Sequence, residues 1–196
     1  MVKKITKYHI LMLYTGDYNK RYYLGELASL LKKPHQTIKP YVEALTKEKI
    51  LIKIKRKNIT EFFLNLKDKK TYSYLIIAEN ERTLERIQQD TIIRLLFEKL
   101  SKHFQKNTFI LFGSAVNSLQ KGSDIDLLVI GKQNIVKTLE EFESVYNKKI
   151  HKIQIIKLES LTPALLKEIY KKHLILNNME LVIRFFGDLY EKNKLV

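Results

Sequence analysis

The sequence contains no cysteine, only three prolines and six glycines, and no long apolar run. Without cysteine the chain can form neither a disulfide framework nor a thiolate metal site. Its longest apolar runs fall far below the roughly 20 residues that span a bilayer, and the N-terminus lacks the pattern of a signal peptide. We therefore expect a cytoplasmic protein with no membrane role.

The positive charge is unevenly distributed. The formal net charge is +15, and residues 1–70 carry 17 Lys and Arg against 6 Asp and Glu, a net of +11. Residues 71–196 carry 19 against 15, a net of +4. Such asymmetry is typical of a polyanion-binding module joined to a more neutral one. A solvated, lysine-rich surface without a polyanion partner remains the alternative.

The first third of the chain has the pattern of three short helices followed by a hairpin. Apolar residues recur at helical spacing in three segments, and two β-prone runs flank the turn Lys57-Asn58. The expected helices cover residues 3–14, 22–31 and 35–49, and the expected strands cover residues 50–55 and 60–66. This order resembles the winged helix-turn-helix family, over about residues 3–68, and we assign residues 1–68 to that domain.

The resemblance to winged helices implies binding of double-stranded DNA. In that family the helix corresponding to residues 35–49 lies in the major groove, and the hairpin wing touches the backbone. Side chains that can donate to bases or phosphates occupy the expected exposed positions: Gln36, Thr37, Lys39 and Lys47 on the helix, and Lys55, Arg56 and Lys57 on the wing. A dimerisation or protein-docking role for the same domain remains the alternative. Winged-helix regulators are often two-fold symmetric, so a homodimer is the expected assembly.

The segment 69–105 is rich in Leu, Ile, Glu and Arg and has neither Gly nor Pro. It predicts one or two helices that connect two domains. The strongly apolar run 181–190 either completes a core or forms an oligomer interface.

Residues 108–131 hold the most informative motif. An apolar run at 109–112 predicts a strand, Gly113-Ser114 a tight turn, and Ala115 onward a helix. A second strand is expected over residues 123–130, beginning with Ser123. Strand periodicity then places Asp124 and Asp126 on one face, about 7 Å apart.

These residue types suit a Mg²⁺ and phosphate site. Mg²⁺ is usually held by one or two carboxylates together with substrate phosphates, a role that Asp124 and Asp126 could fill. Gly113 allows close backbone approach, while Ser114, Ser123 and the N–H groups of a following helix could bind phosphate oxygens.

The Gly-Ser turn followed by Ser-Asp-Ile-Asp and an apolar strand resembles the polymerase beta nucleotidyltransferase superfamily in its minimal form, over roughly residues 90–190. The resemblance implies Mg²⁺-dependent nucleotidyl transfer from a nucleoside triphosphate, with ATP the expected donor, to a hydroxyl. It also implies catalytic, metal-binding roles for Asp124 and Asp126 and nucleotide contacts by Gly113, Ser114 and Ser123. Some minimal members are antitoxins that modify a partner toxin, so a partner protein and autoregulation through DNA are further expectations.

One feature of the resemblance is missing. Active members add a third carboxylate on a later strand, here residues 149–156, which has no acid. Either His151 or Gln154 occupies the corresponding place, and Glu159 follows the strand. The alternative function is therefore a transcription regulator whose inactive second domain senses nucleotide or pairs subunits.

The expected fold is α/β (α+β). It comprises the winged helix-turn-helix, a helical connector over residues 69–105, and a small nucleotidyltransferase fold over residues 106–196 whose mixed sheet is flanked by helices.

Overall fold

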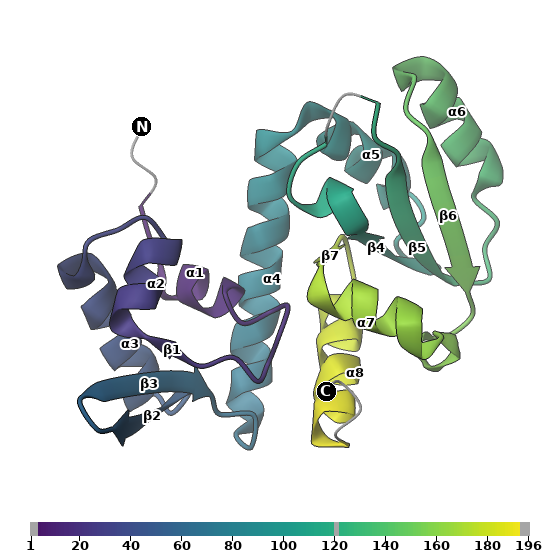
Figure 1. The fold of residues 1–196 in the computed structure, drawn as a ribbon. Helices are drawn as coiled ribbons and strands as arrows, with labels where there is room; N and C mark the ends of the chain where they lie inside the picture. Colours follow the sequence, from purple (N-terminus) through teal and green to yellow (C-terminus); the bar gives the residue numbers. More distant parts are fainter. Residues whose placement is uncertain (1–3, 120–121, 193–196) are drawn as a thin grey trace.

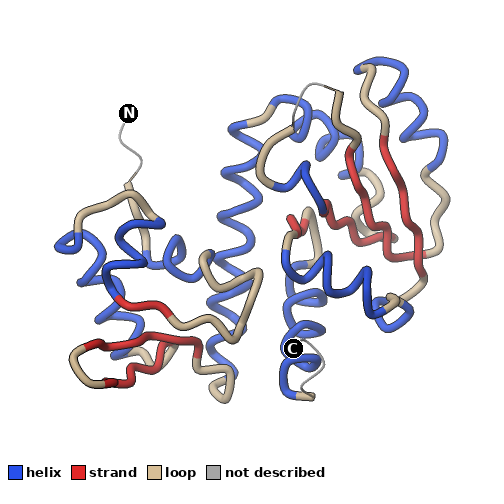
Figure 2. Tube along the Cα trace, in the orientation of Figure 1, coloured by secondary structure: helices blue, strands red, loops and turns tan. Residues whose placement is uncertain are grey.

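The computed structural model describes residues 4–119 and 122–192 of the chain. Two sheets lie apart on either side of one long helix, as Figure 2 shows. No helix in the described part is long and apolar enough to cross a membrane.

The N-terminal part consists of three helices and a three-stranded antiparallel sheet of order β1-β3-β2. The helices are α1 (Lys7–Met12), α2 (Leu24–Leu30) and α3 (His35–Lys47), and the hairpin strands are β2 (Leu51–Arg56) and β3 (Ile59–Leu64). This order of three helices and a hairpin agrees with the sequence-based expectation. Apolar residues of α3, among them Ile38 and Leu45, are fully buried.

One short strand was not expected. Tyr22–Tyr23, assigned from the sequence to the start of a helix, instead forms β1 and pairs with Phe62 and Glu61 of β3. The hydroxyl of Tyr22 donates to the carbonyl of Leu13 at 2.9 Å, and the Tyr14 hydroxyl donates to the carbonyl of Phe62 at 3.0 Å. The β propensity of two adjacent tyrosines and these tertiary hydrogen bonds outweigh the helical pattern.

The segment 69–105 forms two helices, α4 (Lys69–Gln89) and α5 (Thr91–Ser101). Asp90 separates them: its extended backbone ends α4, and its carboxylate accepts hydrogen bonds from the N–H groups of Ile92 and Ile93, capping α5. Helix α4 stands between the N-terminal elements and the second sheet (Figure 1) and contacts both α1 and α8.

The second sheet is mixed, with strand order β6-β5-β4-β7. Its strands are β4 (Asn107–Phe112), β5 (Ile125–Gly131), β6 (Ile150–Ile155) and β7 (His173–Ile175). Strand β5 runs antiparallel to β4 and parallel to β6, and α6 (Val136–Tyr146) makes the crossover that a parallel pair requires. The expected mixed sheet is therefore confirmed.

Helices cover both faces of this sheet. Alternate strand residues such as Leu111 and Leu127 pack with α5 and α6, whereas Ile110 and Leu128 pack with α7 (Pro163–Lys171) and α8 (Met179–Glu191). The run 181–190 lies in α8, where Val182, Ile183 and Phe186 are fully buried. This run therefore completes the core, although Leu181 remains half exposed.

Candidate functional site

The Gly-Ser turn and the two aspartates meet at one end of the second sheet. Strand β4 ends at Phe112, and the antiparallel register places Phe112 beside Asp126 of β5. Gly113 follows with φ +67°, a conformation that favours glycine. A Cβ atom on Gly113 would lie only 2.5 Å from Asp126 Oδ2. The Asp126 carboxylate thus occupies the space beside the turn that a side chain at position 113 would need.

The helix expected after the turn is shorter than predicted. Instead of a helix from Ala115 onward, a single 3₁₀ turn covers Gly113–Val116, with Ala115 and Val116 buried and Ser114 exposed. A turn of this length has too small a dipole to attract a phosphate by itself. Any contact with phosphate would depend on individual backbone N–H groups and the Ser114 hydroxyl.

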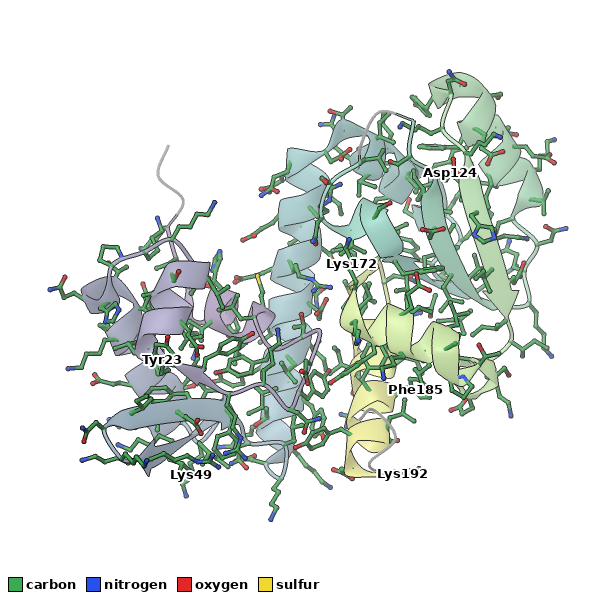
Figure 3. The ribbon with its side chains drawn as sticks, viewed as in Figure 1. Tyr23, Lys49, Asp124, Lys172, Phe185 and Lys192 are labelled. Atoms are coloured by element: carbon green, nitrogen blue, oxygen red, sulfur yellow. The ribbon has the colours of Figure 1, made fainter. Side chains whose placement is uncertain are left out.

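Asp124 and Asp126 occupy the N-terminal end of β5. Asp126 lies on the strand and is partly exposed, whereas Asp124 is exposed one residue before the strand begins (Figure 3). Ile125 between them is fully buried in the core formed with α5 and α6. Ser123 precedes Asp124 and is partly exposed.

The parallel pairing of β5 and β6 identifies the residue beside Asp126. Its partner is His151, and 3.4 Å separates His151 Nδ1 from Asp126 Oδ1. Gln154 lies on the opposite face, where its side-chain amide donates to the carbonyls of Gly131 and Gln133, each at 3.1 Å. Of the two candidates for the third position, only His151 adjoins the aspartates.

Glu159 does not join this group. It lies in a 3₁₀ turn, Leu158–Ser160, beyond the C-terminal end of β6, whereas His151 is near that strand's N-terminal end. Glu159 instead lines a hollow between α7 and α8.

The donor set fits a magnesium ion shared with a substrate better than a resident ion. In the described part of the chain, no group of three or more His, Asp or Glu side chains could hold a metal. Two carboxylates, one exposed and one partly exposed, are nevertheless a common protein contribution to Mg²⁺ when a nucleotide supplies the remaining oxygens. Asp124 and Asp126 would be those ligands.

The N-terminal residues singled out from the sequence are all exposed. These are Gln36, Thr37, Lys39 and Lys47 on α3, and Lys55, Arg56 and Lys57 on the hairpin. Two of them have carboxylate neighbours: Lys39 Nζ lies 3.8 Å from Glu43 Oε1, and Arg56 Nε lies 3.5 Å from Glu61 Oε2.

A groove between α3 and the hairpin gathers part of this charge. Its lining includes Lys39 and Lys47 on one side and Lys53 and Lys55 on the other, over apolar side chains such as Val42. Lys53 was missed in the sequence, although the two-residue period of β2 places it on the same face as Lys55. Within residues 4–119 and 122–192, no carboxylate pairs with Lys47, Lys53, Lys55 or Lys57.

Comparison with known proteins gives one family match that spans this part of the chain. Residues 96–180 match the model of the family described as "Polymerase beta, Nucleotidyltransferase". The match runs from within α5 to the start of α8 and so includes the Gly-Ser turn, both aspartates and β6. No curated protein and no solved structure matches the chain. Residues 96–180 are therefore similar to the polymerase beta nucleotidyltransferase family.

Proposed function

We propose that the C-terminal domain binds a nucleoside triphosphate with Mg²⁺ and transfers its nucleotidyl group to a hydroxyl, with ATP the expected donor. The observation that carries this proposal is the position of the Asp126 carboxylate in the space beside Gly113 that a side chain there would fill, with Asp124 exposed two residues away. A phosphate chain against the turn would therefore lie within reach of both carboxylates.

The residues have separate roles in the proposed transfer. Gly113 lets the turn lie close to the Asp126 carboxylate, Ser114 can donate a hydrogen bond to phosphate oxygens, and the two carboxylates would hold the metal. When bound, Mg²⁺ supplies charge that stabilises the attacking and leaving oxygens of an in-line displacement. The acceptor oxygen forms a bond to the α-phosphorus, the bond to the bridging oxygen breaks, pyrophosphate leaves, and the hydroxyl proton passes to solvent.

Calorimetric titration tests the nucleotide site. MgATP, MgGTP, MgCTP and MgUTP are each titrated into the wild type and into the double variant Asp124→Asn, Asp126→Asn. The matched control is Asp188→Asn, which removes an exposed carboxylate from α8. We expect saturable binding to the wild type and the control, and a loss of about 100-fold or more in the double variant. Absence of binding to the wild type would refute the proposal.

We also propose that the N-terminal part is a winged helix that binds double-stranded DNA, with α3 in the major groove and the β2–β3 hairpin on the backbone. The order of its elements supports this proposal, as do the exposed polar face of α3 and the basic groove beside the hairpin. Lysines without carboxylate partners can release counterions from phosphates, which gives binding that weakens with salt.

The salt dependence of binding tests the wing. We compare the wild type with Lys53→Ala, Lys55→Ala, Lys57→Ala by fluorescence anisotropy on duplex DNA over a series of salt concentrations. Each lost phosphate contact should reduce the slope of log K against log salt by about 0.9, so the triple variant should flatten it by about 2 to 3. The control is Lys137→Ala, Lys167→Ala, Lys171→Ala, which removes the same charge from exposed sites in the other domain. Equal slopes for the two triple variants would contradict the wing's role.

His151 favours a second candidate, a DNA-binding regulator whose nucleotidyltransferase domain is inactive. It occupies the position beside Asp126 where a third carboxylate is expected, and an imidazole contributes no negative charge for a second metal. If catalysis has lapsed for this reason, His151→Asp should create pyrophosphate-releasing activity or at least tighter Mg²⁺ binding. His151→Asn, whose new side chain has the size of aspartate but no charge, should have neither effect. Pyrophosphate release by the wild type would favour the enzyme.

The acceptor is proposed to be a hydroxyl of a partner protein, with DNA binding regulating the genes of the pair. This proposal rests on the resemblance to antitoxin-type minimal nucleotidyltransferases. Incubation with labelled ATP and the product of an adjacent gene, followed by mass spectrometry, should show a nucleotidyl group on that product. Labelling that does not depend on Asp124 and Asp126 would contradict it.

A further inference from the structure

A buried arginine on α4 contacts the backbone of the Gly-Ser turn. Arg86 is only 8% exposed although it carries a full charge. Its Nε donates to the carbonyl of Val116 at 3.1 Å, and its Nη2 donates to the carbonyl of Ala115 at 3.2 Å. Both acceptors belong to the 3₁₀ turn that begins at Gly113. The guanidinium thus holds the carbonyl end of the turn.

The charge of Arg86 is balanced by Asp90, which lies 2.8 Å from the same Nη2. Asp90 is itself fixed because its other carboxylate oxygen caps α5. The end of α4, the adjoining start of α5, and the turn after β4, which follows about 30 residues later, are therefore joined at one point. Such a connected, buried arrangement restricts the guanidinium to one geometry.

The turn needs an external support. A single 3₁₀ turn has few internal hydrogen bonds, and the last carbonyls of any helical turn lack partners within it. Gly113 adds conformational freedom at its first residue. Contact with Asp126 limits the turn at that end, while Arg86 limits it at the other. Removing Arg86 would leave the carbonyls of Ala115 and Val116 without this donor, and at that end of the turn only the packing of their buried side chains would remain.

We propose that Arg86 is a positioning residue for the nucleotide: by fixing the carbonyls of Ala115 and Val116, it sets the place of Gly113 and Ser114, which would meet the phosphates. This inference rests on the proposed function of the turn. Arg86 touches no substrate in this scheme and acts only through the backbone. It extends the site into α4, outside residues 96–180.

The test uses Arg86→Met, which keeps length but removes the donors, and Arg86→Lys, which keeps the charge without the planar fork. The control is Arg94→Met on α5, where the arginine is exposed. In the full chain, hydrogen exchange is measured by mass spectrometry for the peptide 112–119 and for peptides of β5 and α8. Affinity is measured by calorimetry with each of MgATP, MgGTP, MgCTP and MgUTP.

We expect Arg86→Met to raise exchange in residues 113–116 about tenfold or more, with β5 and α8 protected as in the wild type, and to weaken nucleotide binding about tenfold. Arg86→Lys should have a smaller effect on both, and Arg94→Met should stay within twofold of the wild type. A merely structural role would raise exchange throughout the domain by one factor and leave the affinity of the folded protein unchanged.

The outcomes separate this inference from the proposed function. If no triphosphate binds the wild type, the proposed function fails regardless of Arg86. If the wild type binds but Arg86→Met keeps its affinity, or if exchange in residues 113–116 is unchanged, the positioning role is overturned. Should Arg86→Met fail to fold, the same criteria apply to Arg86→Lys.

Discussion

Replacing Gly113 by alanine would perturb the contact between the turn and the carboxylate in two ways. The backbone φ of +67° lies in the left-handed region, where an L side chain is strained. The new Cβ would also lie 2.5 Å from Asp126 Oδ2, so the carboxylate would have to withdraw by about 0.9 Å before reaching ordinary contact at 3.4 Å. The first effect concerns stability and the second concerns the metal ligand.

The two effects have different magnitudes. Left-handed strain costs about 1–2 kcal/mol, and relief of the overlap adds about 1 kcal/mol, since Asp126 is partly exposed and can move more readily than a core residue. Mg²⁺ requires nearly ideal geometry at short ligand distances. A carboxylate moved by close to 1 Å should therefore weaken Mg²⁺-nucleotide binding about tenfold or more.

Gly122 provides a matched control because it also has a positive φ, +85°, but no atom lies within 4 Å of its Cβ position. Gly122→Ala should lose about 1–2 kcal/mol in urea unfolding and bind MgATP nearly as the wild type does. Gly113→Ala should lose more stability and bind about tenfold more weakly in calorimetry. Equal stability losses together with wild-type affinity in Gly113→Ala would refute the argument that the position of the Asp126 carboxylate depends on the absence of a Cβ atom at Gly113.

Three further predictions concern buried contacts that support the domains. Burial opposes ionisation of Glu79, but the neighbouring Arg82 and His173 outweigh it and hold the pKa of Glu79 below the usual value. The stability that the ionised Glu79 contributes should be present above a pH of about 4.3 and decline as pH falls through the lowered pKa. Glu79→Gln should remove this contribution from the unfolding free energy measured in urea between acid and neutral pH. A pH profile of the unfolding free energy identical to that of the wild type would contradict the prediction. Gly187→Ala should destabilise the protein by about 1–3 kcal/mol, because its Cβ would lie 2.3 Å from the Tyr72 ring, and Tyr72→Leu should relieve most of the loss in a double-mutant cycle. Asn177→Ala should lower the unfolding free energy by about 2–3 kcal/mol, since the side chain bridges one buried amide and two carbonyls; a loss below 0.5 kcal/mol, typical of surface changes, would show that these groups find other partners.

Elements with strong local periodicity were predictable from the sequence. Helix α3 begins at His35 as expected, and the bounds of β2 and β6 differ by one residue from the expected strands. Each of these elements packs against the core on one side, so its apolar residues recur at a regular spacing that is visible within the segment itself. The apolar pattern of residues 69–105 does not decide between one helix and two, although Asp90 before an apolar run is a capping signal.

Short strands were not predictable because their hydrogen bonds come from distant segments. Strand β1 has two residues and β7 has three, too few for a period to show. His173 of β7 is fully buried beside Glu79 of α4, 94 positions earlier, with 3.5 Å between His173 Nε2 and Glu79 Oε1. Tertiary pairing rather than local propensity fixes these strands.

The site was predictable in its motif but not in its surroundings. The spacing of the Gly-Ser turn and the aspartates indicated that they lie close together in the fold. Whether His151 or Gln154 lies beside Asp126 depended on the register of the parallel pair β5 and β6. That register depends on the packing of α6 and of both sheet faces. A shift of β6 by one residue would exchange the faces of the sheet on which His151 and Gln154 lie. The contact of Arg86 with the turn was not predictable. An arginine in an exposed, salt-bridged helix face and a buried arginine that binds a distant turn can have the same local sequence.

The helix α4 is more than a connector, because its successive turns contact both parts of the molecule. Glu81 accepts a hydrogen bond from Thr6 before α1 at 3.1 Å, and Arg82 donates to Thr15 after α1 at 2.8 Å and also to the carbonyl of His173 in β7. One turn later Arg86 reaches the Gly-Ser turn. A rigid helix with buried contacts on both sides fixes the relative position of what it joins, unlike a flexible linker. If both proposed activities are present, DNA held by α3 and a nucleotide held beside Asp126 would therefore keep a constant distance and orientation relative to each other. A substitution at Arg82 should disturb the binding of both ligands.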